Sequence, residues 1–108
     1  MSEFKLTAQD CALAACEVLR VAHDDMMSHY CRDRRVVFAR EIAIFLARQD
    51  THASYTEIAQ IVGHSSHATT IAAMRRATKK HAADQEFRLR VAEAAAQAER
   101  YAMRRAQQ

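Results

Sequence analysis

Two clusters of positively charged side chains are the residues of this chain best suited to chemistry, because arginine and lysine bind anions. The first cluster contains Arg32, Arg34, Arg35 and Arg40, and the second contains Arg75, Arg76, Lys79 and Lys80. The formal net charge of the chain is only +3, so the distribution of charge is more informative than its sum. A solvated surface is the usual alternative explanation of such clusters. Two local basic patches nevertheless fit a protein with an anionic partner.

Catalytic chemistry is not indicated by any arrangement of residues in the sequence. With one glycine, the chain has no glycine-rich phosphate loop, and it lacks a nucleophile elbow and a paired acidic motif. Ser65, Ser66 and His67 are too close together in sequence to imply a catalytic triad. We therefore expect no enzyme activity and no catalytic residue.

Metal binding is the other chemistry to consider, since the chain has six histidines and three cysteines. Neither the spacing of Cys11 and Cys16 nor the pair His64 and His67 completes a known four-ligand zinc pattern. We expect no metal and no other cofactor. Because the three cysteines form an odd number without CxxC spacing, we expect free thiols in a reducing compartment.

The composition favours an all-α fold. Hydrophobic residues make up 50% of the chain but aromatic residues only 6%, so the core is expected to consist of close helix contacts through alanine. The absence of proline and the single glycine leave few sites for tight turns. The length of 108 residues predicts one domain over residues 1–108. No run of about 18 apolar residues and no signal peptide are present, which predicts a cytoplasmic protein without membrane contact.

Hydrophobic periodicity predicts five to six helices. The first helix runs from Thr7 to about Val21, with Thr7 and Asp10 at the spacing of a capping box. Asp24 and Asp25 are predicted to cap a short helical turn that ends at His29. The basic stretch that follows, residues 32–35, is expected to be exposed to solvent.

Two longer helices are predicted, one in the middle of the chain and one at its C-terminal end. Apolar residues recur at helical spacing over residues 34–48, which predicts a long, buried helix, and residues 49–53 are expected to form a loop. A C-terminal helix is predicted over residues 83–106. We expect the apolar line of this last helix, from Phe87 to Ala102, to pack on the core, and the alternative is a weak homodimer through the same line.

The segment between these two helices is a candidate helix-turn-helix. Ser54 and Glu57 form a capping box, and Gly63 stands where a helix C-terminus favours glycine. Ser65 or Ser66 can then cap a second helix that runs from about His67 to Lys79. The turn is about two residues longer than in the common form of this motif.

The longer turn carries a specific resemblance to a known family. Residues 63–71, with the sequence GHSSHATTI, resemble the signature GGRDHTTVL of the DnaA C-terminal DNA-binding domain. Residues 36–47, VVFAREIAIFLA, are similar to the VARPRQMAMALA of that family, and residues 54–63 are similar to its SLPEIGDAFG. The similarity covers about residues 11–92. It implies a helix-turn-helix fold like that of the Trp repressor and binding of double-stranded DNA, with a nucleoid-associated location.

The resemblance also implies roles for individual residues. Arg32 occupies the position of a family arginine that enters the minor groove, and Arg40 occupies that of an arginine that contacts the DNA backbone. Glu41 occupies the position of a glutamine. His67 and Thr69 match signature residues that read the major groove. The expected DNA-binding residues are Arg32, Arg34, Arg35, Arg40, Glu41, Ser54, Ser65, Ser66, His67, Ala68, Thr69, Thr70 and Arg75.

Departures from the signature affect the expected base preference. Ser65 and Ser66 replace Arg-Asp, and Ala68 replaces the first of two threonines. A serine hydroxyl accepts a hydrogen bond from cytosine less selectively than an aspartate carboxylate does. Ala68 retains only the contact of its methyl group with thymine. The preferred site is therefore expected to differ from a standard DnaA box.

The expected partners are double-stranded DNA and a replication protein such as the initiator or the helicase. DnaA itself carries an ATP-binding AAA+ domain, whereas this sequence has no GxxxxGK[ST] phosphate loop, so initiator activity of its own is not expected. Regulation of replication initiation and regulation of transcription both remain open. The alternative is a protein-interaction module on a helix-turn-helix scaffold.

Overall fold

The computed structural model describes residues 5–28 and 30–108, which form helices and no strand. This confirms the predicted all-α fold. The helices are α1 (Ala8–Leu19), α2 (His23–Met27), α3 (Arg34–Asp50), α4 (Tyr55–Val62), α5 (His67–Ala83) and α6 (Gln85–Ala106).

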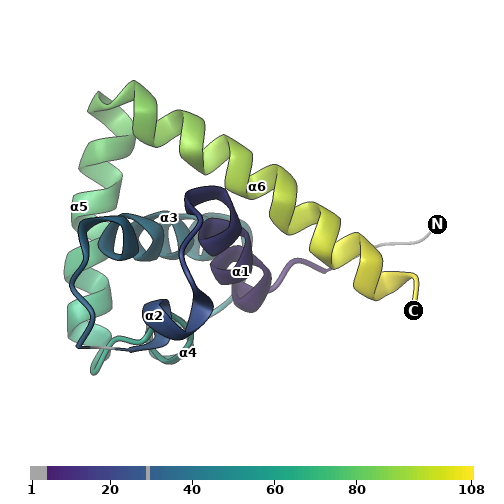
Figure 1. The fold of residues 1–108 in the computed structure, drawn as a ribbon, viewed down its shortest axis with the longest axis horizontal. Helices are drawn as coiled ribbons and strands as arrows, with labels where there is room; N and C mark the ends of the chain where they lie inside the picture. The colour runs from purple at the N-terminus through teal and green to yellow at the C-terminus, as the bar shows by residue number, and fades with distance from the viewer. Residues whose placement is uncertain (1–4, 29) are drawn as a thin grey trace.

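Helix α3 lies in the middle of the fold and contacts each of the other five helices. Helix α5 stands at one edge of the molecule, and α6 returns across α1 and α3 to the opposite end (Figure 1). Helix α4 packs against α5, α1 and α3. The central position of α3 means that its side chains can reach both the turn between α4 and α5 and the loop that precedes α3.

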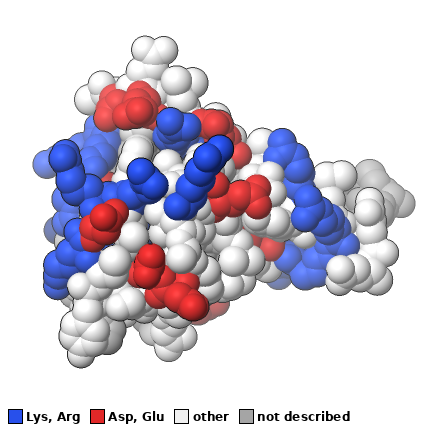
Figure 2. Space-filling model, viewed as in Figure 1, with Lys and Arg blue, Asp and Glu red and all other residues white. Residues whose placement is uncertain are grey.

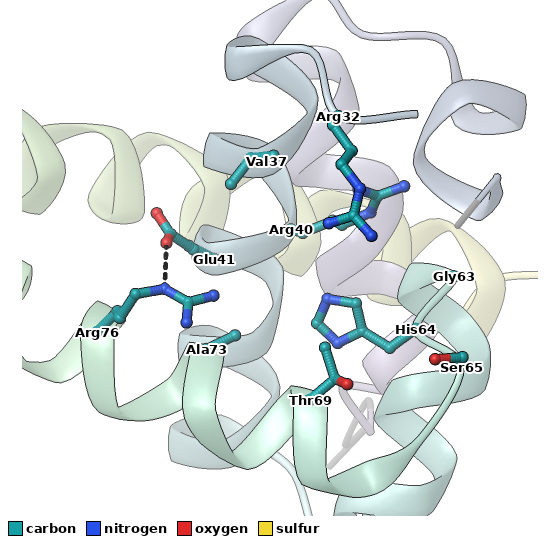
Figure 3. Close-up of a pocket in the computed structure, with 10 residues that line it drawn as sticks. All are labelled: Arg32, Val37, Arg40, Glu41, Gly63, His64, Ser65, Thr69, Ala73 and Arg76. Carbon is teal, nitrogen blue, oxygen red and sulfur yellow. Dashed lines mark hydrogen bonds and ion pairs between the residues drawn. The ribbon is translucent and has the colours of Figure 1, made fainter. Parts of the chain in front are cut away.

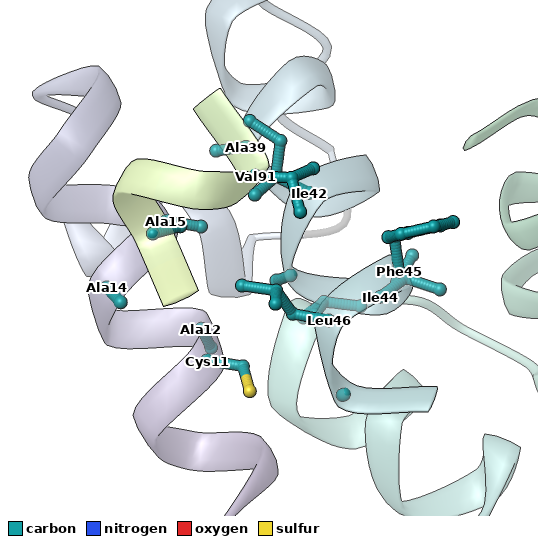
Figure 4. Close-up of a cluster of buried hydrophobic side chains, with 14 of the residues drawn as sticks. Cys11, Ala12, Ala14, Ala15, Ala39, Ile42, Ile44, Phe45, Leu46 and Val91 are labelled. Carbon is teal, nitrogen blue, oxygen red and sulfur yellow. The ribbon is translucent and has the colours of Figure 1, made fainter. Parts of the chain in front are cut away.

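The core between α1, α3 and α6 is built largely from alanine (Figure 4). Ala12 and Ala15 of α1, Ala39 of α3 and Ala94 of α6 are all 0% exposed. Such small side chains allow the helix backbones to approach closely. Larger side chains fill the space toward α5, where Phe87 lies edge-on to Phe45 with ring centroids 6.1 Å apart.

Three of the predicted helix ends are confirmed by their hydrogen bonds. Thr7 and Asp10 form a complete capping box at the start of α1, and Ser54 and Glu57 form another at the start of α4. Gly63 ends α4 in the left-handed conformation with φ 78°. The sequence was sufficient to predict these helix ends because each signal depends only on residues within one helical turn.

Other boundaries differ from the prediction. Helix α2 begins at His23 after Ala22, whose side chain makes no cap, so the prediction that Asp24 and Asp25 cap a later turn is wrong. Both aspartates lie in the first turn instead, where negative charge is favourable. The predicted end of this segment, His29, lies outside the described residues.

The two long helices extend beyond their predicted ends. Helix α3 continues to Asp50, inside the predicted loop, and stops where the Thr51 hydroxyl donates to the Ala47 carbonyl oxygen. Helix α5 continues to Ala83, and Asp84 then accepts from the first N–H groups of α6. The last helix therefore starts at Gln85 rather than at Ala83.

Contacts between α6 and the start of the described chain close the fold. Arg105 donates to the Asp10 carboxylate at 2.6 Å and to the Lys5 carbonyl oxygen at 2.7 Å. Burial raises the pKa of Asp10, but hydrogen bonds from Arg105 and Thr7 outweigh it, so the pKa lies below its ordinary value.

Candidate nucleic-acid interface

The turn between α4 and α5 presents the first turn of α5 to solvent. Ser66 caps this helix by accepting from the Thr69 N–H at 3.3 Å, and all five residues from 65 to 69 are exposed. The predicted reading residues in this segment, Ser65, Ser66, His67, Ala68 and Thr69, are therefore accessible together. An exposed helix N-terminus with this arrangement can enter a major groove.

Gly63 allows the turn to approach the end of α2. A Cβ atom at this position would lie 2.4 Å from the Met26 carbonyl oxygen and 2.5 Å from that of Met27. Its φ of +78° also belongs to the left-handed region. Glycine is thus required here both by conformation and by the close passage of another backbone.

Thr70 was predicted to contact DNA, but the structure places it inside the fold. It is 0% exposed, and its hydroxyl lies 2.8 Å from Nδ1 of His64. Burial lowers the pKa of His64 to about 4, and the positive charges of Arg40 and Arg76 contribute to the shift. The His64–Thr70 pair is therefore neutral at pH 7, and its contact stabilises the turn from the buried side.

A surface depression lies between α3, the turn and α5 (Figure 3). Arg32 extends over it from the loop before α3, and Thr69 and Arg76 border it from α5. The residues that line it are Arg32, Val37, Arg40, Glu41, Gly63, His64, Ser65, Thr69, Ala73 and Arg76. The depression thus brings Arg32 and Arg40 of the first basic cluster and Arg76 of the second cluster to one place.

Arg40 occupies a buried position beneath this depression. Its side chain donates to five backbone carbonyl oxygens, those of Asp25, Met26, Ser28, Cys31 and Val62. The residue is only 6% exposed, and burial lowers the pKa of its guanidinium. These contacts join the loop after α2 to the end of α4, which is a structural role. Contact with the DNA backbone stays a prediction for this residue.

Glu41 is also buried and forms ion pairs with two cations of α5. Its carboxylate oxygens lie 3.4 Å from Nε of Arg76 and 2.5 Å from Nζ of Lys80. The Glu41 side chain is 3% exposed, whereas those of Arg76 and Lys80 are 55% and 44% exposed. The predicted site residue Glu41 is therefore screened from solvent by two cations that remain accessible.

The remaining predicted residues lie apart from this depression. Arg34 and Arg35 begin α3, are exposed as expected, and border a separate surface with Lys80 and Arg90. Arg75 is exposed farther along α5, while the Ser54 side chain caps α4. The basic stretch before α3 is thus divided between two surfaces rather than directed as a whole toward the turn.

The surface charge follows the same division. Figure 2 shows lysine and arginine side chains gathered where α5 lies and again along the C-terminal part of α6, with acidic side chains between the two groups. Cations of the second group are engaged locally, since Arg105 bonds Asp10 and Arg104 lies 5.7 Å from the Tyr101 ring centre. The group on α5 is the one next to the exposed turn.

The predicted DNA-binding residues did not include Arg76 and His64, two polar residues that line the depression. Thr69, Ala73 and Arg76 are spaced by four and three residues, so they share one face of α5, a pattern that was readable in the sequence. His64 replaces the second glycine of the signature, and that departure was a further signal.

Other features of the described residues bear on the remaining predictions. Within residues 5–28 and 30–108, no cluster of histidine, cysteine and acidic side chains is arranged to hold a metal ion. None of the helices in that part of the chain is long and apolar enough to cross a bilayer. Burial raises the pKa of Cys11 to about 12 and that of Cys16 to about 11, so both thiols are unreactive small side chains of the core.

Comparison with known proteins gives a consistent result. A family model described as the bacterial DnaA protein helix-turn-helix matches residues 9–77. The chromosomal replication initiator protein DnaA of Geobacter sp. (strain M21) is 38% identical over 60 residues, which are 56% of this chain and 13% of that protein. The protein of the same name from Sphingopyxis alaskensis is 33% identical over 88 residues, 82% of this chain and 19% of the relative. The chain therefore spans less than a fifth of the length of these relatives. No solved structure matches it.

Proposed function

Because the chain belongs to the bacterial DnaA helix-turn-helix family, we propose that it binds double-stranded DNA through the first turn of α5 and the loop before α3. The observation that carries this proposal is the exposure of residues 65–69 beside a depression bordered by Arg32 and Arg76. Exposed side chains on a helix N-terminus suit base edges in the major groove, and the flanking arginines suit phosphates or a narrow minor groove.

The residues divide into three roles in this proposal. Ser65, Ser66, His67, Ala68 and Thr69 read base edges. Arg32 enters the minor groove, while Arg34, Arg35 and Arg75 supply salt-dependent attraction to the duplex. Arg40, Thr70 and Ser54 hold the backbone of the motif in place, because their polar groups bond within the protein.

The target proposed here is a site similar to a DnaA box, altered at the positions read by Ser66 and Ala68. The relatives are named as chromosomal replication initiators, which supports a role in regulation of replication initiation. Regulation of transcription from such sites is compatible with the same interface. A protein partner at an origin, such as the initiator or the helicase, would compensate for the modest affinity of a single module.

The proposal is tested by fluorescence anisotropy with duplexes that carry a DnaA box, a scrambled box or a pool of random genomic sequence, each at two salt concentrations. Binding with a preference for the box or a related sequence supports the proposal. Salt-sensitive binding without any preference supports DNA binding but not sequence reading. Absence of binding to all three duplexes contradicts the proposal and favours a protein-interaction module.

Matched variants locate the interface. Arg32→Ala and His67→Ala remove exposed side chains from the proposed surface, and Arg100→Ala removes an exposed cation from α6. We expect the first two variants to bind DNA more weakly with unchanged circular dichroism, while the third binds as the wild type does. Equal losses in all three would indicate general charge attraction instead of this interface.

A further inference from the structure

The ion pairs of Glu41 have a consequence for the strength of DNA binding. We infer that Glu41 competes with DNA phosphates for Arg76 and Lys80, and so restrains the affinity of the interface. This inference rests on the proposed function, since Arg76 borders the proposed surface and Lys80 follows one turn later on α5. It assigns to Glu41 a role opposite to that of a DNA contact.

The geometry places a negative charge behind the cations that a duplex would meet first. The carboxylate is 3% exposed and lies against Nε of Arg76 and Nζ of Lys80, and both cations project from α5 into solvent. Figure 3 shows Arg76 reaching from α5 to the carboxylate of Glu41 on α3. A phosphate that approaches this face of α5 must share each cation with a carboxylate that is already bound.

Burial makes this competition effective. A charge removed from water is poorly screened by salt and by solvent, so the carboxylate acts on its neighbours more strongly than a surface acid does. Arg40 lies in the same depression, but its donors are directed to backbone carbonyl oxygens. Glu41 therefore acts mainly on the two cations of α5.

The neutral isostere Glu41→Gln tests the inference because it removes the charge and retains the shape of the side chain. We expect Glu41→Gln to bind every duplex more tightly at low salt, by about threefold for each cation released. The slope of log Kd against log salt concentration should become steeper by about 1 to 2, since each phosphate contact contributes about 0.9. The preference between the DnaA box and the scrambled box should not change.

A control separates this effect from net charge. Glu99 is an exposed acid in the C-terminal half of α6 and borders neither the depression nor the surface that carries Arg34 and Arg35. Glu99→Gln changes the net charge by the same amount, and we expect it to alter the affinity much less than Glu41→Gln does. Equal gains in both variants would overturn the inference, because any lost negative charge would then be sufficient.

A merely structural role for Glu41 predicts the opposite sign. Loss of two ion pairs should lower the melting temperature of Glu41→Gln, and a structural residue whose removal loosens α5 would weaken binding as well. Tighter binding by a less stable variant supports competition. Unchanged or weaker binding overturns the inference while leaving the proposed function intact, whereas absence of binding by the wild type and the variant overturns both.

A mutant cycle shows whether Glu41 acts through its two partners. In an Arg76→Ala, Lys80→Ala background the carboxylate has no cation of α5 to withhold, so adding Glu41→Gln should leave the affinity unchanged. A gain of the same size in both backgrounds would mean that Glu41 repels phosphates directly and does not act by holding the two side chains.

Discussion

The Thr70 hydroxyl lies 2.8 Å from Nδ1 of His64, and this contact joins the turn of the helix-turn-helix to the buried face of α5. Both residues depart from the DnaA signature, which has a glycine and a valine at these two positions. The side chain of His64 thus fills space at the turn that a glycine would leave open. The pair places an ionisable group in the part of the fold that positions the reading residues.

The low pKa of His64 predicts a loss of stability in mild acid. Its pKa is about 4 in the folded protein, against 6.5 for the unperturbed group, so the unfolded chain binds the proton more readily. The stability gained from a neutral His64 is therefore complete above about pH 6.5 and is lost as the pH falls toward 4. The shift corresponds to about 2 to 3 kcal/mol after allowance for solvent screening.

Thermal unfolding between pH 7.5 and 4.5 measures this effect in wild type, His64→Asn and His52→Asn. Asparagine at position 64 can replace the Nδ1 contact without titrating, so its melting temperature should fall less in acid than that of the wild type. His52 is exposed, and its replacement should leave the acid sensitivity unchanged. The same acid sensitivity in all three proteins would contradict the assignment to His64.

Replacement of Gly63 should destabilise the fold through a backbone clash. In Gly63→Ala the new Cβ would lie within 2.4 Å of the Met26 carbonyl oxygen, in a left-handed conformation that alanine also disfavours. We expect a loss of at least about 2 kcal/mol in the free energy of unfolding, measured by urea denaturation. Gly63→Asn tolerates the left-handed conformation but retains the clash, so it should not recover stability. Recovery in Gly63→Asn would show that conformation alone requires glycine.

Replacement of Arg40 should affect folding more than phosphate contact. In Arg40→Gln a neutral amide replaces a charged fork that donates to five carbonyl oxygens, and we expect a loss of about 2 to 4 kcal/mol in stability. At a temperature where the variant is folded, the salt dependence of DNA binding should match that of the wild type. A shallower dependence would show that Arg40 reaches a DNA phosphate after all.

Two substitutions toward the DnaA signature should change the base preference without loss of stability. Ser66→Asp keeps a residue that caps α5, and Ala68→Thr adds a hydroxyl at an exposed position. The double variant should favour a standard DnaA box by about 1 to 3 kcal/mol per altered base contact. Sequencing of duplexes selected from a randomised library by each protein measures the change. An identical selected sequence for both proteins would remove these positions from the reading surface.

The accuracy of the sequence predictions depended on how far apart the interacting residues are. Capping at Thr7 and Ser54 and the end of α4 at Gly63 involve neighbours within a turn, and all were predicted. The inward direction of Thr70 was also predictable, because Thr70, Ala73 and Ala77 recur at spacings of three and four on the buried face of α5.

Contacts between distant residues were not predictable in the same way. The partners of Arg40 are backbone carbonyl oxygens, which every residue carries, so no residue type marks them in the sequence. Glu41 meets Arg76 across 35 positions and Lys80 across 39, and only the packing of α5 on α3 brings them together. The exposed reading residues could thus be found from sequence similarity, while the charges that modulate them required the fold.

The bond between Arg105 and Asp10 has a consequence for the order of folding. These residues are 95 positions apart, so their contact closes nearly the longest loop that the chain can form, whereas α4, the turn and α5 meet through short-range contacts. Contacts of high sequence separation form slowly because loop-closure entropy opposes them. We therefore expect the helix-turn-helix to form early in folding and α6 to dock on α1 late. After docking, the contact between Arg105 and Asp10 protects both ends of the described chain from fraying.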